Sequence, residues 1–201
     1  MRRREFITII GGAAVTWPLA ARAQQPAMPV IGFLNGQSLA NFTHLLAAFR
    51  SGLSETGYEE GRNTAIEFRW AEGRADRLPV LAHELVRRQV AVIVATGGAH
   101  LAAKEATATI PIVCTMGDPL KLGLVGSLSR PGGNLTGVSI LTNELEPKRL
   151  ELLQELVPQP APFAGLLDPN FPEAAGQARE LQAAARTMDR QVHIVSASTE
   201  V

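Results

Sequence analysis

The sequence predicts an α/β protein in which a Rossmann-like lobe with a parallel sheet, complete or nearly so, is followed by an incomplete second α/β lobe. Two observations predict this class. From residue 30 onward, short β-branched runs alternate with segments of helical periodicity, which is the pattern of repeated βαβ units. Residues 91–95 form a continuous apolar run, as expected for a central parallel strand that is covered on both faces.

The first lobe is predicted to span residues 30–142. Ser38 is a candidate N-cap for its first helix, which should end near Gly57. Apolar residues spaced three and four apart predict the buried face of that helix as Phe42, Leu45, Leu46, Phe49 and Leu53. The predicted strands are residues 30–34, 64–70, 91–95, 112–115 and 137–141. The other predicted helices are one with the face Leu78, Leu81, Leu85 and Val86, then residues 100–107 and 120–128.

The second lobe is predicted to span residues 143–201 and to be interrupted. Its predicted elements are a helix at 145–157, a strand at 163–167, a helix at 173–188 and a strand at 192–195. Two strands and their helices rarely bury enough surface to be stable alone, so we expect that the chain is truncated relative to a full lobe. The alternative is that this segment packs onto the first lobe as extra strands or helices.

Residues 1–23 have the layout of an export signal: a basic start, an apolar stretch and a small-residue site that ends at Ala23. The adjacent arginines near the start indicate the twin-arginine type. We therefore expect a periplasmic protein that is cleaved after Ala23, with residues 24–29 as a linker. An alternative is a cytoplasmic first strand over residues 6–10. The apolar stretch is shorter than the ~20 residues that a membrane-spanning helix needs.

Charge and cysteine usage exclude several classes of protein. Without residues 1–23, which hold four arginines and one glutamate, the chain has 15 basic and 18 acidic side chains, a net charge of −3, so nucleic-acid binding is not expected. Cys114 is the only cysteine and lies in a predicted strand, which favours a buried structural thiol over a catalytic one. The lone histidines are interpreted as surface or core-edge residues without metal-ligand spacing, and they are His44, His83, His100 and His193.

Candidate binding residues follow three predicted strands of the first lobe. Ligands of open parallel sheets bind outside the carboxyl ends of the strands, where loops lead into helix N-termini. The hydroxyls of Ser38 and Thr96 can donate to a carboxylate, and Asp118 can accept from an amine, which suits a small zwitterion. The alternative for each loop is ordinary turn and cap chemistry, with Ser38 and Asp118 as N-caps. The candidates from this lobe are Asn35, Gln37, Ser38, Thr96, Gly97, Gly98, Gly117 and Asp118.

The second lobe offers Asp168 and Asn170, which follow its first predicted strand and should face the first lobe across a cleft. A plain turn is the alternative. The sequence contains no G-x-G-x-x-G after a strand, no Walker lysine motif and no G-x-S-x-G elbow. We therefore expect no catalytic residues, no metal and no cofactor.

One block of sequence carries a family resemblance. It runs from Gly117-Asp118-Pro119 through Arg130-Pro131-Gly132-Gly133-Asn134 to Thr136-Gly137-Val138. This block closely resembles the ABC-transporter substrate-binding proteins of the tryptophan/tyrosine-transport type. The resemblance implies a type I periplasmic-binding-protein fold, whose two Rossmann-like lobes close on a small ligand, often an aromatic amino acid. It also implies ABC permease subunits in the inner membrane as partners, and a monomer if the chain is full-length. Family members continue for roughly another half of a domain.

The Arg-Pro-Gly-Gly-Asn motif is predicted to end a helix and to turn sharply into the next strand. Arg130 is then expected at the end of that helix, or as a partner of the other lobe.

The leading hypothesis is a periplasmic solute-binding component of an ABC importer that binds a small amino-acid-like ligand by hinge closure. One alternative is a cytoplasmic ligand-sensing module of the regulator type, which would need a DNA-reading helix-turn-helix where the export signal lies. The other is a Rossmann-like nucleotide-binding enzyme that uses residues 96–98 as a phosphate loop.

Overall fold

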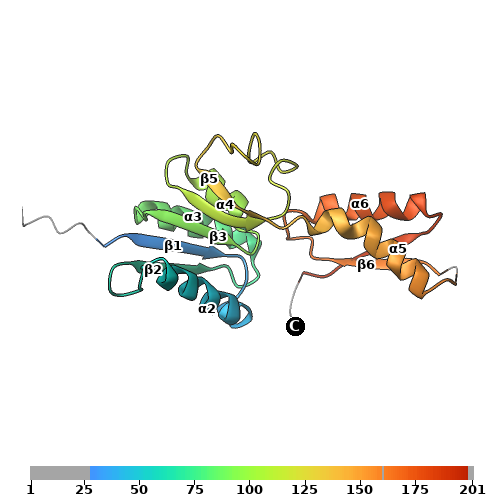
Figure 1. The fold of residues 1–201 in the computed structure, drawn as a ribbon, viewed down its shortest axis with the longest axis horizontal. Helices are drawn as coiled ribbons and strands as arrows, with labels where there is room; N and C mark the ends of the chain where they lie inside the picture. Colours follow the sequence, from blue (N-terminus) through green and yellow to red (C-terminus); the bar gives the residue numbers. More distant parts are fainter. Residues whose placement is uncertain (1–27, 160, 199–201) are drawn as a thin grey trace, which may run out of the picture.

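The computed structural model describes residues 28–159 and 161–198, which form two lobes side by side (Figure 1). The first lobe has a five-stranded sheet in the order β2-β1-β3-β4-β5, and the second has a two-stranded sheet, β6-β7. All of these strand pairs are parallel. The predicted export signal, its cleavage site and most of the predicted linker lie outside the described residues.

The first lobe follows the predicted alternation of strands and helices closely. Its elements are β1 (Val30–Asn35), α2 (Leu39–Glu55), β2 (Ala65–Trp70), η1 (Ala75–Arg77), α3 (Leu78–Arg87), β3 (Val92–Thr96), α4 (His100–Ala106), β4 (Ile112–Met116) and β5 (Leu135–Ser139). The predicted central position of β3 is confirmed, since it pairs with β1 on one side and β4 on the other.

Helices cover both faces of the large sheet. On one face α3 and α4 pack against alternate strand residues such as Leu34, Ile93 and Ile112, which are fully buried. On the other face α2 packs through Phe42 and Leu46 against an aromatic cluster. The rings that meet around Phe33 are those of Phe42, Phe49, Phe68 and Trp70. Strand alternation thus sends neighbouring side chains into two separate cores.

The predicted buried face of α2 is wrong at one position. Leu45 is 47% exposed, whereas Phe42 and Leu46 are buried. A helix advances 100° per residue, so Leu45 lies at the edge of the apolar face of α2. Only the centre of this face contacts the sheet.

The predicted helix at residues 120–128 is also wrong, because only turns form there. The side-chain Oδ1 of Asp118 accepts the backbone N–H groups of Leu120 and Lys121, so a first turn is capped as a helix would be. Gly123 then takes a φ of +68°, and its N–H bonds to the carbonyl of Leu120. A positive φ at this position ends the helical path after one turn.

The Arg-Pro-Gly-Gly-Asn motif therefore does not end a helix, and its asparagine is the structural residue. The Asn134 Nδ2 donates to the carbonyls of Thr107 and Ile110 at 3.0 and 2.8 Å, and its Oδ1 accepts from the Lys104 ammonium at 2.7 Å. Asn134 so ties the end of α4 and the loop before β4 to the start of β5.

The prediction for Arg130 is wrong as well. Its side chain is exposed and forms no hydrogen bond or ion pair with any described residue. Only its backbone is held, by the Ser127 hydroxyl.

The second lobe contains η2 (Thr142–Leu145), α5 (Glu146–Leu156), β6 (Phe163–Leu167), α6 (Ala174–Thr187) and β7 (Val192–Ser196). Its two strands pair with each other and not with the large sheet, so the alternative of extra strands on the first lobe is wrong. Leu150 of α5 and Leu181 of α6 meet Phe163 and Leu167 in one core. The opposite face of this sheet is open, with Leu166 at 71% exposure.

Replacing Asn134 by alanine should lower the free energy of unfolding by about 1–3 kcal/mol, because two partly buried carbonyls and an ammonium lose their partner. Chemical denaturation followed by circular dichroism measures this change. Arg130→Ala, in the same motif, is the matched control and should change stability by less than about 0.5 kcal/mol. Equal losses in both variants would contradict the role given to Asn134.

Candidate ligand-binding site

The strands β1, β3 and β4 run in the same direction, and their carboxyl ends face the second lobe (Figure 1). The loop that follows β6 reaches them through residues 171–173. A Cβ at Gly98 would lie 3.2 Å from Pro172, and the Gly117 N–H donates to the Glu173 carboxylate at 3.1 Å. The first-lobe loops singled out in the sequence therefore gather at one sheet edge, in contact with the second lobe.

Asn35 and Thr96 join the first two of these loops internally. Asn35 is fully buried, and its Nδ2 donates to the Thr96 hydroxyl at 2.8 Å while its Oδ1 accepts the Gln37 N–H at 2.7 Å. A Cβ at Gly36 would come within 2.1 Å of the Gly97 carbonyl, so this approach requires glycine. Asn35 and Thr96 support the loops and do not line the cavities between the lobes.

The loops after β1 and β3 meet the second lobe at two hollows. The larger, of about 520 Å³, is here called the polar cavity, and it is lined by Gln37, Ser38, Asn41, Glu72, Gly73, Arg74, Asp168, Ala197 and Ser198. A small hollow of about 70 Å³ beside it brings Gly97 and Gly98 together with Asp168 and Asn170. Ser38 occupies the N-cap position of α2 but makes no side-chain cap bond, and Asp168 Oδ1 accepts the Asn170 N–H at 2.9 Å.

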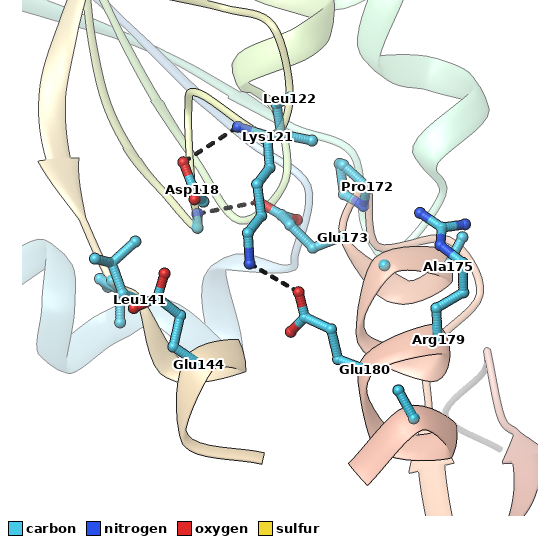
Figure 2. A pocket seen from close by; sticks show the side chains of 14 residues that line it. Asp118, Lys121, Leu122, Leu141, Glu144, Pro172, Glu173, Ala175, Arg179 and Glu180 are labelled. Atoms are coloured by element: carbon cyan, nitrogen blue, oxygen red, sulfur yellow. Dashed lines mark hydrogen bonds and ion pairs between the residues drawn. The ribbon is translucent and has the colours of Figure 1, made fainter. Parts of the chain in front are cut away.

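Gly117 and Asp118 line a different cavity, of about 540 Å³, which is called the mixed cavity (Figure 2). It lies between the loop after β4, the crossover that follows β5, and one face of α6. Its lining is Gly117, Asp118, Lys121, Leu122, Ile140, Leu141, Glu144, Pro172, Glu173, Ala175, Gly176, Arg179, Glu180 and Ala183. Figure 2 shows Lys121 reaching across to Glu180, and the two form an ion pair of 2.8 Å between the lobes.

A buried histidine and a buried glutamate lie close together where the two lobes meet. His100 is fully buried, and its Nε2 lies 3.7 Å from Glu173 Oε1. Neither His100 nitrogen nor Glu173 Oε2 has a hydrogen-bond partner among the described residues. Burial lowers the pKa of His100, and the nearby Glu173 carboxylate offsets this in part. His100 therefore corrects the interpretation of lone histidines as surface or core-edge residues.

Sequence reasoning missed the residues that α6 supplies. Residues 175, 176, 179, 180 and 183 of α6 follow the three-and-four spacing of one helix face and all line the mixed cavity. This spacing begins directly after the loop that follows β6, and it could have marked Arg179 and Glu180 as candidates.

Other chemistry has little support in the structure. Cys114 is 2% exposed, and burial raises the pKa of its thiol to about 11, so it stays protonated near neutral pH as a structural residue. Within residues 28–159 and 161–198, no group of three or more potential ligand side chains could hold a metal ion.

Comparison with known proteins identifies the family. The family described as "ABC transporter substrate binding protein" matches residues 27–200. The chain belongs to this family. It is a family of binding proteins and not of enzymes, which confirms the corresponding prediction. The chain is also similar to a tyrosine-binding protein of Clostridioides difficile, with 35% identity over 114 residues that cover 55% of this chain and 32% of that protein.

Solved structures show the same fold. A conserved domain protein from Vibrio cholerae matches with a TM-score of 0.77 and 25% identity over 86% of this chain and 58% of that one. An ABC domain from Streptococcus pneumonia in complex with L-Trp matches with a TM-score of 0.73 and 24% identity, at the same coverage. A leucine-binding protein from Thermotoga maritima has a TM-score of 0.62 at 14% identity, over 87% of this chain and 50% of that one. The predicted type I periplasmic-binding-protein fold is confirmed.

The chain spans about a third of the curated relative's length and less than two thirds of the length of these structures.

The buried His100 should make stability depend on pH. Its folded-state pKa is lowered, so the unfolded state takes up a proton more readily, and stability is kept above about pH 6.5 and lost as the pH falls below it. Melting temperatures between pH 7.5 and 5.5 should fall for the wild type and change less for His100→Gln. The control His83→Gln, at an exposed site on α3, should keep the wild-type dependence. If His100→Gln left the pH dependence of the melting temperature unchanged, His100 would not be its cause.

Proposed function

We propose that this chain is the solute-binding component of an ABC importer and binds a small amino-acid-like ligand between its two lobes. The observation that carries the proposal is the charged lining of the interlobe space. The first lobe supplies Asp118 and Lys121 and the second supplies Arg179 and Glu180, so both signs of charge come from both sides. A zwitterion is the small ligand that such a lining matches.

Hinge closure is the binding mode that the interlobe contacts favour. The lobes already meet through Glu173 with Gly117 and through Lys121 with Glu180. A ligand that contacts both lobes adds free energy to the closed arrangement only, and therefore shifts the population toward it.

The relatives support an amino acid as the ligand, since one is described as tyrosine-binding and another was solved in complex with L-Trp. Of the binding residues predicted from the sequence, those that line the cavities between the lobes stay candidates for ligand contact, and they are Gln37, Ser38, Gly97, Gly98, Gly117, Asp118, Asp168 and Asn170. Asn35 and Thr96 are proposed instead as supports of the loops.

We place the protein in the periplasm, with ABC permease subunits of the inner membrane as its partners. The family membership and the export-signal layout of residues 1–23 support this placement. In the part of the chain that the structure describes, no helix has the length and apolar character needed to cross a membrane.

A panel of L-amino acids should contain at least one that raises the melting temperature. At a ligand concentration of 100 times Kd, binding to the folded state stabilises it by about 2.7 kcal/mol, which corresponds to roughly 5–10 °C for a chain of this size. L-tyrosine and L-tryptophan are the first ligands to test, with glucose as the uncharged control. A well-folded sample that responds to no amino acid would overturn the proposed function.

Export by the twin-arginine route predicts a second result. Replacing Arg3 and Arg4 together by lysine should retain the tagged protein in the cytoplasm at its uncleaved size, whereas the wild type should appear in the periplasm without residues 1–23. Cell fractionation with N-terminal sequencing measures both. Cytoplasmic, uncleaved wild-type protein would argue against the periplasmic placement.

A further inference from the structure

We propose that acid weakens the contact between the two lobes, because closing the lobes buries the His100 imidazole where a positive charge on it is unfavourable. The contact is then a pH-sensitive switch between a closed and an open arrangement. This property belongs to the lobe contact itself and goes beyond the proposed function, since no ligand takes part in it.

His100 lies in the first lobe at the place where the second lobe meets it. It is the first residue of α4, and its Nε2 lies 3.7 Å from Oε1 of Glu173, the residue before α6. Two positions before His100, a Cβ at Gly98 would lie 3.2 Å from Pro172 and 3.7 Å from the ring of Phe171. His100 is 0% exposed, and the second lobe is part of its cover. Separating the lobes therefore gives water access to the imidazole.

The closed arrangement favours the uncharged form of this imidazole. Neither ring nitrogen of His100 has a hydrogen-bond partner among the described residues. An imidazolium has two N–H donors where the neutral ring has one, so protonation would leave one more buried donor without an acceptor. The N–H groups in the first turn of α4 also carry partial positive charge, which disfavours a cation at this end of the helix.

The Glu173 carboxylate opposes this effect but does not outweigh it. The 3.7 Å between its Oε1 and His100 Nε2 is longer than the ~3.2 Å limit of an ordinary N–H···O hydrogen bond, and Oε1 already accepts the Gly117 N–H. Burial is the larger influence and lowers the pKa of His100, while attraction to Glu173 offsets part of the shift. Protonation of the closed form is therefore less favourable than protonation of a hydrated imidazole.

The other titratable groups around α4 leave this balance unchanged, since Glu173 is the one charged group that acts on the imidazole. Strand β3 holds no titratable side chain, and β4 holds only Cys114, whose thiol stays protonated. The remaining groups are exposed or already bonded elsewhere. They are Lys104 and Glu105 of α4, His83, Glu84 and Arg87 of α3, Asp118 and Lys121 after β4, and Asp168 after β6.

Linkage between protonation and lobe opening sets the sign and the size of the effect. In the open arrangement the hydrated imidazole titrates near its usual pKa of about 6.5, whereas in the closed arrangement its pKa is lower. The contact is therefore kept above about pH 6.5 and weakened as the pH falls below it. Between pH 7.5 and 5.5 the ratio of open to closed molecules should rise by up to about ten-fold.

The test is single-molecule fluorescence energy transfer in the ligand-free chain, with dyes at Ser51→Cys and Gln182→Cys. Both sites are exposed, on α2 of the first lobe and α6 of the second, whereas Cys114 is buried and its thiol, with a pKa of about 11, should not react with the dyes. The ratio of long to short distances should rise by up to about ten-fold from pH 7.5 to 5.5. His100→Gln removes the titrating group, so its ratio should change little.

Two further variants separate the imidazole from its surroundings. His83→Gln, at an exposed site on α3, keeps His100 and should respond as the wild type does. Glu173→Gln removes the anion beside the imidazole, so its response to acid should be larger than that of the wild type. Melting temperatures at pH 7.5 check that each variant is folded.

Three outcomes would overturn the proposal. The first is a wild-type ratio that stays constant or shifts toward the short distance in acid, which would mean that an ion pair of His100 with Glu173 dominates. The second is a full response in His100→Gln, and the third is a lost response in Glu173→Gln, which would make the glutamate the switch. No ligand is present in these measurements, so the proposed function is tested separately by the amino-acid panel.

Discussion

Parallel strand direction is the constraint on which the rest of this structure depends. Because β1, β3 and β4 run the same way in adjacent positions, the loops that leave their carboxyl ends open at one edge of the sheet. Each loop then leads into a helix or a capped turn, so backbone N–H groups such as that of Gly117 point away from the lobe. The second lobe meets the first at this edge, and every interlobe contact described above involves it.

At the contact between the lobes, one buried carboxylate oxygen has no hydrogen-bond partner among the described residues. The Glu173 Oε1 accepts the Gly117 N–H of the first lobe, whereas Oε2 has no partner. Beside this carboxylate lies His100, whose pKa is lowered by burial. Buried polar atoms without partners are unfavourable, and they mark positions where a bound molecule gains more than it would at the surface. The same residue lines the mixed cavity, so a single glutamate both joins the lobes and borders the space between them.

Local patterns predicted most elements because their signals are short in range. The strand at residues 163–167 and the helix around Leu78 follow from apolar spacing within one element. The helix expected at 120–128 failed for an equally local reason, since Gly123 adopts a positive φ after the turn that Asp118 caps. The predicted burial of Leu45 was wrong because the spacing of apolar residues does not tell how wide the strip of helix surface is that contacts the sheet.

The sequence by itself determined the α/β class, the alternation of strands and helices, the loops at the sheet edge and, through the Asp-Pro to Arg-Pro-Gly-Gly-Asn block, the family. Only the tertiary structure decided that these loops face two separate cavities, that His100 is buried, and that Arg179 and Glu180 of α6 complete one of the cavities. The physical reason is separation along the chain. Gly117 and Glu173 are 56 residues apart, and their contact depends on how the two lobes dock, which no periodicity within either segment encodes.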